Sequence, residues 1–145
     1  MLNKSFINKK YPPIIFKIEK NHLIKFAKAT GQKNPIYFDE KIAKKNNHPS
    51  ILAPLTFLTV IAHEHKQLQQ YIVDIGIDFS TVLHAGQKYT YHNPIYAGDT
   101  ITMENQILDI YEKKEGTLIF IDIESTYNNQ NNIMVSQSLS TLVSQ

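Results

Sequence analysis

From Val82 onward the chain alternates strand-like runs with short turn sequences. The runs span residues 82–93, 100–112, 117–127 and 133–143. The separators are rich in residues that favour turns: Tyr96-Ala97-Gly98-Asp99, Lys113-Lys114-Glu115-Gly116 and Asn128-Asn129-Gln130-Asn131-Asn132. Apolar and polar residues alternate within the runs, most clearly at Ile119, Ile121 and Ile123. Short connections of this kind join antiparallel neighbours, so the pattern predicts an antiparallel sheet.

An apolar segment precedes these runs. Pro54 suits the first turn of a helix, and Leu55, Leu58 and Ala62 recur at helical spacing toward Gln69. The segment is apolar nearly all round, through Phe57, Val60 and Ile61, which is typical of a buried helix. One buried helix followed by an antiparallel meander predicts the α+β class, with the helix on one face of the sheet.

Three shorter elements are expected upstream. Tyr11-Pro12-Pro13 leads into a short strand at residues 14–18. Asn21 can cap a helix that Gly31 ends, and Asp39 can cap a short helix that frays at Asn46-Asn47. That capping role explains Asp39 without catalysis.

The bulk properties indicate one domain. The chain has 145 residues and no cysteine, which removes disulfides, thiolate metal ligands and cysteine nucleophiles. It has no apolar run of 18 residues, and residues 1–10 are too polar for a signal peptide. We therefore expect a soluble, cytoplasmic protein that does not enter a membrane.

Charge is distributed unevenly. Residues 1–45 carry 11 Lys and three acidic residues, whereas residues 46–145 carry four Lys and ten acidic residues. The first part is therefore +8 and the remainder −6. A basic region suits a polyanion, such as the phosphates of a coenzyme A or carrier-protein thioester. Nucleic acid is not expected, because the chain has no Arg and no recognisable binding motif.

Three stretches together resemble MaoC-like hotdog dehydratases, whose fold wraps a curved antiparallel sheet around a long helix. The first is Ala29-Thr-Gly-Gln-Lys-Asn-Pro-Ile-Tyr-Phe-Asp39. The second is His48-Pro-Ser-Ile-Leu-Ala-Pro-Leu-Thr-Phe57, which looks like the start of the family's central helix. The third runs from Leu83 to Thr100 and includes Pro94-Ile-Tyr-Ala-Gly-Asp99. The resemblance implies a single hotdog domain over residues 1–145.

The first stretch departs from the family's catalytic pattern. The resemblance places an Asp where Gln32 stands and a His where Tyr37 stands. Neither a Gln amide nor a Tyr with an ordinary pKa near ~10 exchanges a proton at neutral pH as Asp and His do. The family's acid/base pair is therefore replaced at Gln32 and Tyr37.

The second stretch departs in the same direction. Active members have a His-Gly pair at the helix start, whose backbone N–H can polarise the thioester carbonyl. Here Pro54 and Leu55 stand at those two places, and the Leu55 side chain would crowd the approach that Gly permits. The resemblance implies a substrate-binding set of Gln32, Asn34, Tyr37, Ala53, Pro54, Leu55 and His84.

Other residues are weaker catalytic candidates. His84 and His92 lie eight residues apart on an alternating strand, so we expect them to share one face, where either could replace the missing His. Structural hydrogen bonding is the commoner role of such a His. His63 and His65 are two apart on a predicted helix and point about 200° apart, so they cannot share one metal ion. We expect no metal and no cofactor.

Glu64 supports a rival enzymatic interpretation. Hotdog thioesterases place a carboxylate on the central helix to activate water, and Glu64 lies about three turns into the predicted helix. A Glu at such a place more often emerges near the polar end of its helix.

The preferred hypothesis is a subunit of an (R)-3-hydroxyacyl-thioester dehydratase or 2-enoyl-thioester hydratase that is not catalytic alone. It would bind acyl-CoA or an acyl carrier protein thioester beside a catalytic hotdog chain. The first subunit of mycobacterial heterodimeric hydroxyacyl-carrier-protein dehydratases is similar to this chain, including the Ala53-Pro-Leu-Thr-Phe57 helix start. The alternatives are a thioesterase that uses Glu64 and a non-enzymatic acyl-thioester-binding dimer. Exposed sheet edges favour a dimer of identical or different chains.

Overall fold

A single five-stranded sheet organises the molecule. The structure is a computed structural model that describes residues 2–145. The strands are β1 (Ile14–Lys17), β2 (Val82–Tyr91), β3 (Thr100–Lys113), β4 (Leu118–Asn128) and β5 (Met134–Ser144). They pair antiparallel in the order β1-β3-β4-β5-β2, so β1 and β2 are the edge strands. The four predicted runs are confirmed as β2 to β5. The predicted meander is wrong at its first connection, because β2 pairs with β5 at the far edge and not with β3, the next strand along the chain.

The turns follow the predicted chemistry. Gly98 has φ of +92° and Gly116 has φ of +86°, a left-handed conformation that glycine adopts without strain. Asp99 accepts a hydrogen bond from the backbone N–H of Tyr96 through Oδ2 at 2.9 Å. Glycine at these positions and the Asp99 hydrogen bond therefore stabilise the turns before β3 and β4 locally.

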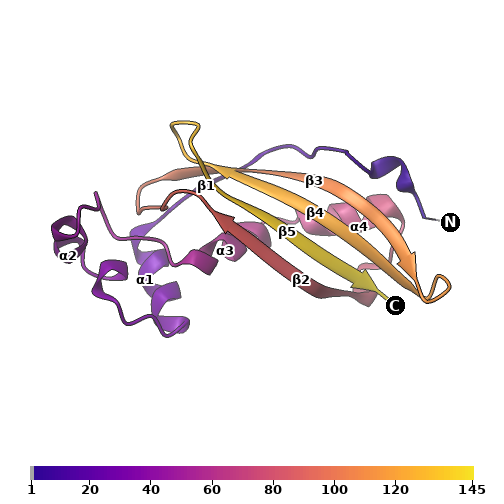
Figure 1. Ribbon diagram of the computed structural model, residues 1–145, viewed down its shortest axis with the longest axis horizontal. Coiled ribbons are helices and arrows are strands. Elements are labelled where there is room, and N and C mark those ends of the chain that lie inside the picture. Colours follow the sequence, from indigo (N-terminus) through magenta and orange to yellow (C-terminus); the bar gives the residue numbers. More distant parts are fainter. Residues whose placement is uncertain (1) are drawn as a thin grey trace.

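The central helical segment lies against one face of the sheet, as expected for the α+β class (Figure 1). It begins with a 3-10 turn, η3 (Leu55–Phe57), and continues as α3 (Leu58–Glu64) and α4 (Gln67–Ile75). The prediction of one continuous helix was wrong, because His65 adopts an extended conformation with φ −106° and ψ 140°. Pro54 precedes the first turn as its N-cap instead of lying inside it.

A smaller helical lobe lies beyond one end of the sheet (Figure 1). It contains α1 (Lys20–Ala29), the 3-10 turn η2 (Pro35–Tyr37) and α2 (Glu40–Lys45). Asp39 is confirmed as the N-cap of α2, because its side chain accepts from the backbone N–H groups of Lys41 and Ile42. Asn21 is not a cap, because α1 begins one residue earlier and its N-cap position is Glu19.

The buried apolar residues form two clusters that divide at the helix break. The α3 cluster contains Phe57, Leu58 and Ile61 together with residues of β1, β3 and the smaller lobe. The α4 cluster contains Ile72 and Ile75 together with residues of β3, β4 and β5. Each half of the central segment thus packs on its own part of the sheet.

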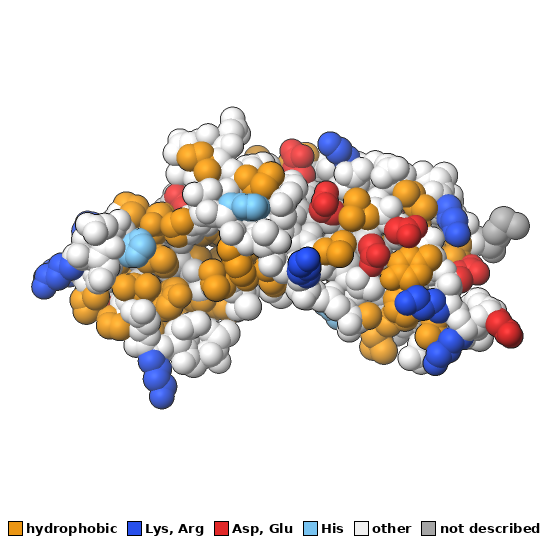
Figure 2. All heavy atoms as spheres, in the orientation of Figure 1, with side chains coloured by type: hydrophobic (Ala, Val, Ile, Leu, Met, Phe, Trp, Pro, Cys, Tyr) orange, Lys and Arg blue, Asp and Glu red, His pale blue; other side chains and the backbone are white. Residues whose placement is uncertain are grey.

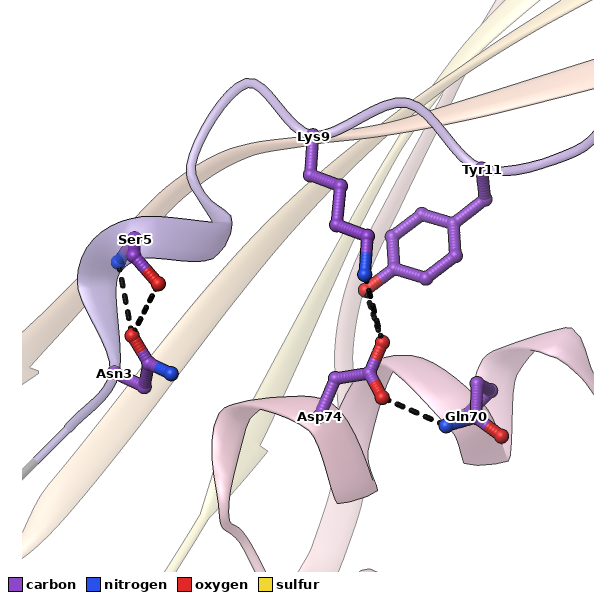
Figure 3. A network of polar contacts seen from close by, with 6 residues as sticks. All are labelled: Asn3, Ser5, Lys9, Tyr11, Gln70 and Asp74. Atoms are coloured by element: carbon purple, nitrogen blue, oxygen red, sulfur yellow. Dashed lines mark hydrogen bonds and ion pairs between the residues drawn. The ribbon is translucent and has the colours of Figure 1, made fainter.

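The N-terminal segment lies along α4 (Figure 3). Asp74 of α4 accepts hydrogen bonds from Lys9 at 3.2 Å, from Tyr11 at 3.0 Å and from Gln70 at 2.6 Å. The rings of Tyr11 and Tyr71 are 4.1 Å apart between centroids. These contacts hold residues 9–11 against the helix.

Charged residues are spread unevenly over the surface. In Figure 2, acidic side chains gather over the half of the face that is farther from α1 and α2. None of the helices within residues 2–145 is long and apolar enough to cross a membrane.

Candidate functional site

A pocket lies where the smaller lobe meets the start of the central segment. We call it the outer pocket. Its lining comprises Tyr37, Leu52, Ala53, Pro54, Leu55, Leu58, Tyr91, Asn93, Pro94, Ile95, Val135 and Ser136. Four of the residues predicted to bind substrate therefore come together here: Tyr37, Ala53, Pro54 and Leu55.

Local hydrogen bonds position Tyr37. The side chain of Asn34 accepts from the backbone N–H of Ile36 at 3.1 Å, which caps the 3-10 turn that carries Tyr37. The Asn34 side chain thus holds the loop that carries Tyr37. Asn34 and Gln32 are not among the residues that line the outer pocket.

Backbone hydrogen bonds position the segment from Leu52 to Leu55. The N–H of Leu52 donates to the oxygen of Ile36 at 3.2 Å, and the N–H of Ala53 donates to the oxygen of Ile95 at 2.8 Å. The segment is therefore tied both to the loop that carries Tyr37 and to the turn after β2. The side chain of Leu55 is 57% exposed and forms part of the pocket rim.

Tyr91 closes the outer pocket from the sheet side. Its hydroxyl donates to the backbone oxygen of Leu55 at 3.1 Å. Burial raises the pKa of Tyr91, so this hydroxyl remains a neutral donor at physiological pH. Sequence interpretation did not select Tyr91. The available signal was its position two residues after Tyr89 on an alternating strand, which places both rings on one face.

A second space, the inner cavity, lies between the central segment and the sheet. It encloses about 50 Å³ and is lined from α3, α4 and all five strands. Apolar residues and polar residues share its wall. The polar ones are Thr59, His63, Gln67, Tyr71, His84, Gln87, Tyr89, Asn105, Ser125, Tyr127 and Ser140. A wall with this many polar groups is unusual between a helix and a sheet, where apolar contacts dominate.

Buried hydrogen bonds connect the polar groups deep in the inner cavity. Ser125 donates to Asn105 Oδ1 at 2.5 Å, and Asn105 Nδ2 donates to Gln67 Oε1 at 2.7 Å. The Tyr71 hydroxyl donates to the same Gln67 oxygen. Asn105 is 4% exposed and Ser125 is 3% exposed. We call Gln67, Tyr71, Asn105 and Ser125 the deep polar network, which joins α4 to β3 and β4.

Two stacked tyrosines separate the spaces. The rings of Tyr89 and Tyr91 lie 5.8 Å apart between centroids with 24° between their planes. Tyr89 lines the inner cavity and Tyr91 lines the outer pocket. The Tyr89 hydroxyl is 2.6 Å from Thr59 Oγ1 on α3, so the partition is fixed to the central segment.

A β-bulge separates His84 from His92. The pairing of β2 with β5 shifts by one residue between His84 and Gly86. His84 lines the inner cavity, whereas His92 lies 3.2 Å from Gln137 Oε1 through its Nε2. The expectation that the two histidines share one face was wrong, because the extra residue of a bulge reverses the alternation after it.

His63 and Glu64 lie in different surroundings. His63 lines the inner cavity, and its Nδ1 is 2.8 Å from the backbone oxygen of Thr59. Glu64 is half-exposed and lies 3.7 Å from His22 Nε2. Glu64 is not among the residues that line either space. Among the described residues, no three His, Cys, Asp or Glu side chains form a group that could hold a metal ion.

The outer pocket can bind and orient a ligand. Its lining includes the Tyr37 and Tyr91 hydroxyls, the Asn93 amide and the Ser136 hydroxyl but no Asp, Glu or His. Such groups donate and accept hydrogen bonds, and none of them exchanges protons readily at neutral pH. A reaction that needs an acid and a base requires further groups from elsewhere.

A family model and a curated relative both match most of this chain. The model of the family described as "FAS1-like, dehydratase domain region" matches residues 5–138. A UPF0336 protein of Streptomyces coelicolor is 37% identical over 109 residues, which cover 73% of this chain and 71% of that protein.

Solved structures share the fold. A chain of the HadBC (3R-hydroxyacyl-ACP dehydratase) complex from Mycobacterium tuberculosis superposes with a TM-score of 0.82 at 23% identity, covering 95% of this chain and 96% of that chain. A chain of the ChsH1-ChsH2 complex from the same organism gives a TM-score of 0.67 at 16% identity, with 96% and 98% coverage. These likenesses show the hotdog fold.

Proposed function

This chain belongs to the family of FAS1-like, MaoC-like dehydratase domains, and we propose that it is a binding subunit that needs a catalytic hotdog partner. The complex would hydrate a 2-enoyl thioester reversibly, or remove water from an (R)-3-hydroxyacyl thioester. This chain would contribute part of the wall that holds the acyl or pantetheine group.

One observation carries the proposal. Tyr37, Ala53, Pro54 and Leu55, four residues of the binding set that the resemblance implies, line one pocket, and that pocket contains no carboxylate and no imidazole. Elimination of water requires a base for the α proton and an acid for the leaving hydroxyl. The pocket supports binding through hydroxyl and amide groups, and the partner would supply the acid and base.

The free edge of β2 supports the need for a partner. β2 pairs with β5 on one side only, so its other side presents unpaired backbone groups. Tyr91 at the end of this strand lines the outer pocket, and its side chain is 40% exposed. A hotdog chain seated along β2 would therefore lie beside the outer pocket.

The two similar structures named above come from complexes with two named components, HadBC and ChsH1-ChsH2. That fact is consistent with a different chain as the partner. Coenzyme A and acyl carrier proteins are both anionic, and the basic first third of the sequence would suit either carrier.

The experiment compares the purified chain alone with a mixture containing a hotdog chain encoded by a neighbouring gene. Hydration of a crotonyl thioester is followed in both. We expect no turnover above buffer with this chain alone and turnover in the mixture. The matched control replaces the Asp and His of the partner's own loop, which should abolish the mixture's activity.

Robust turnover by this chain alone would refute the proposal. Release of free thiol from acyl thioesters, lost in Glu64→Gln, would support the thioesterase alternative. Calorimetry with acyl-CoA identifies the third possibility, because binding without partner-dependent turnover would favour a non-enzymatic binding dimer.

A further inference from the structure

His84 is held with one ring nitrogen bonded to the backbone and the other available. Its Nε2 lies 3.0 Å from the backbone oxygen of Gly86. A carbonyl oxygen can only accept a hydrogen bond, so Nε2 carries the hydrogen and donates it. In a neutral imidazole the other nitrogen, Nδ1, then has a lone pair, and no residue within 2–145 is hydrogen-bonded to it. His84 therefore presents a hydrogen-bond acceptor whose orientation the backbone fixes.

His84 lies at the rim of the inner cavity. It lines the cavity from β2, and His63 lines it from α3. Both histidines are exposed, whereas Asn105 and Ser125 in the same wall are buried. β2 is an edge strand, so this rim opens where the proposed partner would lie.

His84 does not reach the outer pocket of its own chain. β2 begins at the end of the sheet that is farther from α1 and α2, and it ends toward that smaller lobe (Figure 1). His84 is near the start of β2, and Tyr91, which lines the outer pocket, is at its end. A strand rises about 3.3 Å per residue, so roughly 20 Å separates the two residues. The loop that carries Tyr37 is therefore far from His84.

A partner of the same fold would bring its own loop to His84. Every strand pairing in the sheet is antiparallel, and a two-fold axis normal to the sheet would also pair two β2 edges antiparallel. The partner's β2 would then end where this chain's β2 begins, with both sets of helices on one face. His84 and Tyr91 both lie on that face, because His84 lines the inner cavity and Tyr91 bonds to Leu55. The partner's catalytic loop would thus lie beside His84.

An acceptor beside that loop suits one of the reacting groups. The thioester carbonyl gains negative charge during the reaction and needs donors, so a lone pair does not stabilise it. The water that adds to a 2-enoyl thioester has hydrogens to donate. An acceptor bonded to one of these hydrogens would orient the water oxygen toward the β carbon.

We propose that His84 of this chain completes the reaction site of the catalytic partner, where its Nδ1 accepts a hydrogen bond from the water that adds or leaves. This inference rests on the proposed function, because it names the residue of this chain that contacts a reacting group in the complex. During hydration the water oxygen bonds to the β carbon, one of its hydrogens passes to the partner's acid/base pair, and a proton from that pair reaches the α carbon. The second hydrogen stays on the oxygen and bonds to His84, and dehydration is the reverse.

The test measures kcat and KM for hydration of a crotonyl thioester by the mixture of this chain and its hotdog partner. His84→Ala removes the acceptor, so we expect kcat to fall by about tenfold or more while KM changes by less than about twofold. His84→Asn places an amide oxygen near the position of Nδ1 and should restore kcat to within about threefold of wild type. His84 is exposed, so neither substitution should unfold the chain.

His92→Ala is the matched control. His92 is an exposed histidine just after β2, and its Nε2 lies 3.2 Å from Gln137 Oε1 instead of lining the inner cavity. We expect this variant to keep the wild-type kcat. Analytical ultracentrifugation of every mixture measures the association of the two chains, which should be the same in all of them.

Unchanged kcat in His84→Ala, in a mixture whose wild-type form turns over, would overturn the inference and leave the proposed function standing. A fall in kcat that His92→Ala shares, or that weaker association accounts for, would overturn it too. No recovery in His84→Asn would overturn the acceptor role. Absence of turnover by the wild-type mixture is the distinct signature of a failed proposed function, and the inference would fall with it.

Discussion

Asp74 illustrates how a single carboxylate joins segments that are distant in sequence. It receives hydrogen bonds from Gln70 on its own helix and from Tyr11 and Lys9 of the N-terminal segment. These bonds, that from Gln70 most strongly, hold the pKa of Asp74 below its ordinary value. A carboxyl whose pKa is lowered on folding stabilises the protein above its unfolded pKa, and this contribution is lost as pH falls through the folded pKa.

We expect Asp74→Asn to lower the free energy of unfolding by about 1 to 2 kcal/mol at pH 7, because charge-assisted hydrogen bonds are lost. The difference between variant and wild type should shrink as pH falls below about 4, the ordinary pKa of an unfolded Asp, and should vanish as pH falls through the lower pKa of folded Asp74. Urea unfolding at pH 7 and pH 3 measures both effects.

Glu115→Gln serves as the control for this change, because Glu115 is exposed in the turn after β3. Its effect should stay within about 0.5 kcal/mol. An equal loss of stability in Asp74→Asn at both pH values would contradict the assignment.

The deep polar network could be predicted from the sequence only in part. Alternation along β3 and β4 placed Asn105 and Ser125 on predicted strands, and strand alternation fixes which face a residue occupies. Alternation does not identify the residue on the helix to which Asn105 is hydrogen-bonded. Gln67 comes from α4, 38 residues before Asn105, and the pairing arises only when helix and sheet pack.

At the scale of elements, the four long strands were predictable because alternation and turn residues act locally. The helix break and the bulge were not. No Pro or Gly marks the break at His65, and the apolar pattern continues through Ile72 and Ile75. The bulge near Ala85 likewise has no local signature beyond Gly86, and it decided which face His92 occupies.

The end of α4 provides a prediction at this scale. Gly76 has φ of +86° and caps the helix, and a Cβ added there would meet no atom within 4 Å. Gly76→Ala should therefore cost about 1 kcal/mol through backbone strain alone. Thermal and urea unfolding measure the loss.

Gly86→Ala is the matched control for that substitution. Its added Cβ would lie 3.8 Å from Thr141 Cβ, an ordinary contact, and its φ lies outside the left-handed region. We expect little change in stability. If the two substitutions cost the same, backbone conformation is not what Gly76 supplies.

At the scale of the whole molecule, the proposed partner would bind along the free edge of β2. The N–H of His92 donates to Val135, and antiparallel pairing alternates, so the N–H of Gln87 points away from β5. Gln87→Pro would remove an edge donor without breaking the ladder to β5.

We expect Gln87→Pro to weaken association with a second hotdog chain, or with a second copy, by at least about tenfold. Gln87→Ala loses the side-chain bond to Ser140 but keeps the backbone donor, so it should associate normally. Analytical ultracentrifugation compares the two variants. Normal association of Gln87→Pro would show that another surface holds the partner.

The split of the apolar core has a consequence for motion. α3 and α4 pack into separate clusters, and the extended residue His65 interrupts the helical hydrogen bonding between them. Proteins open locally in units that follow such boundaries, so we expect α4 to loosen from the sheet while α3 stays packed. The inner cavity is lined by both helices. A breathing motion of α4 would therefore change the size of that cavity without disturbing the outer pocket.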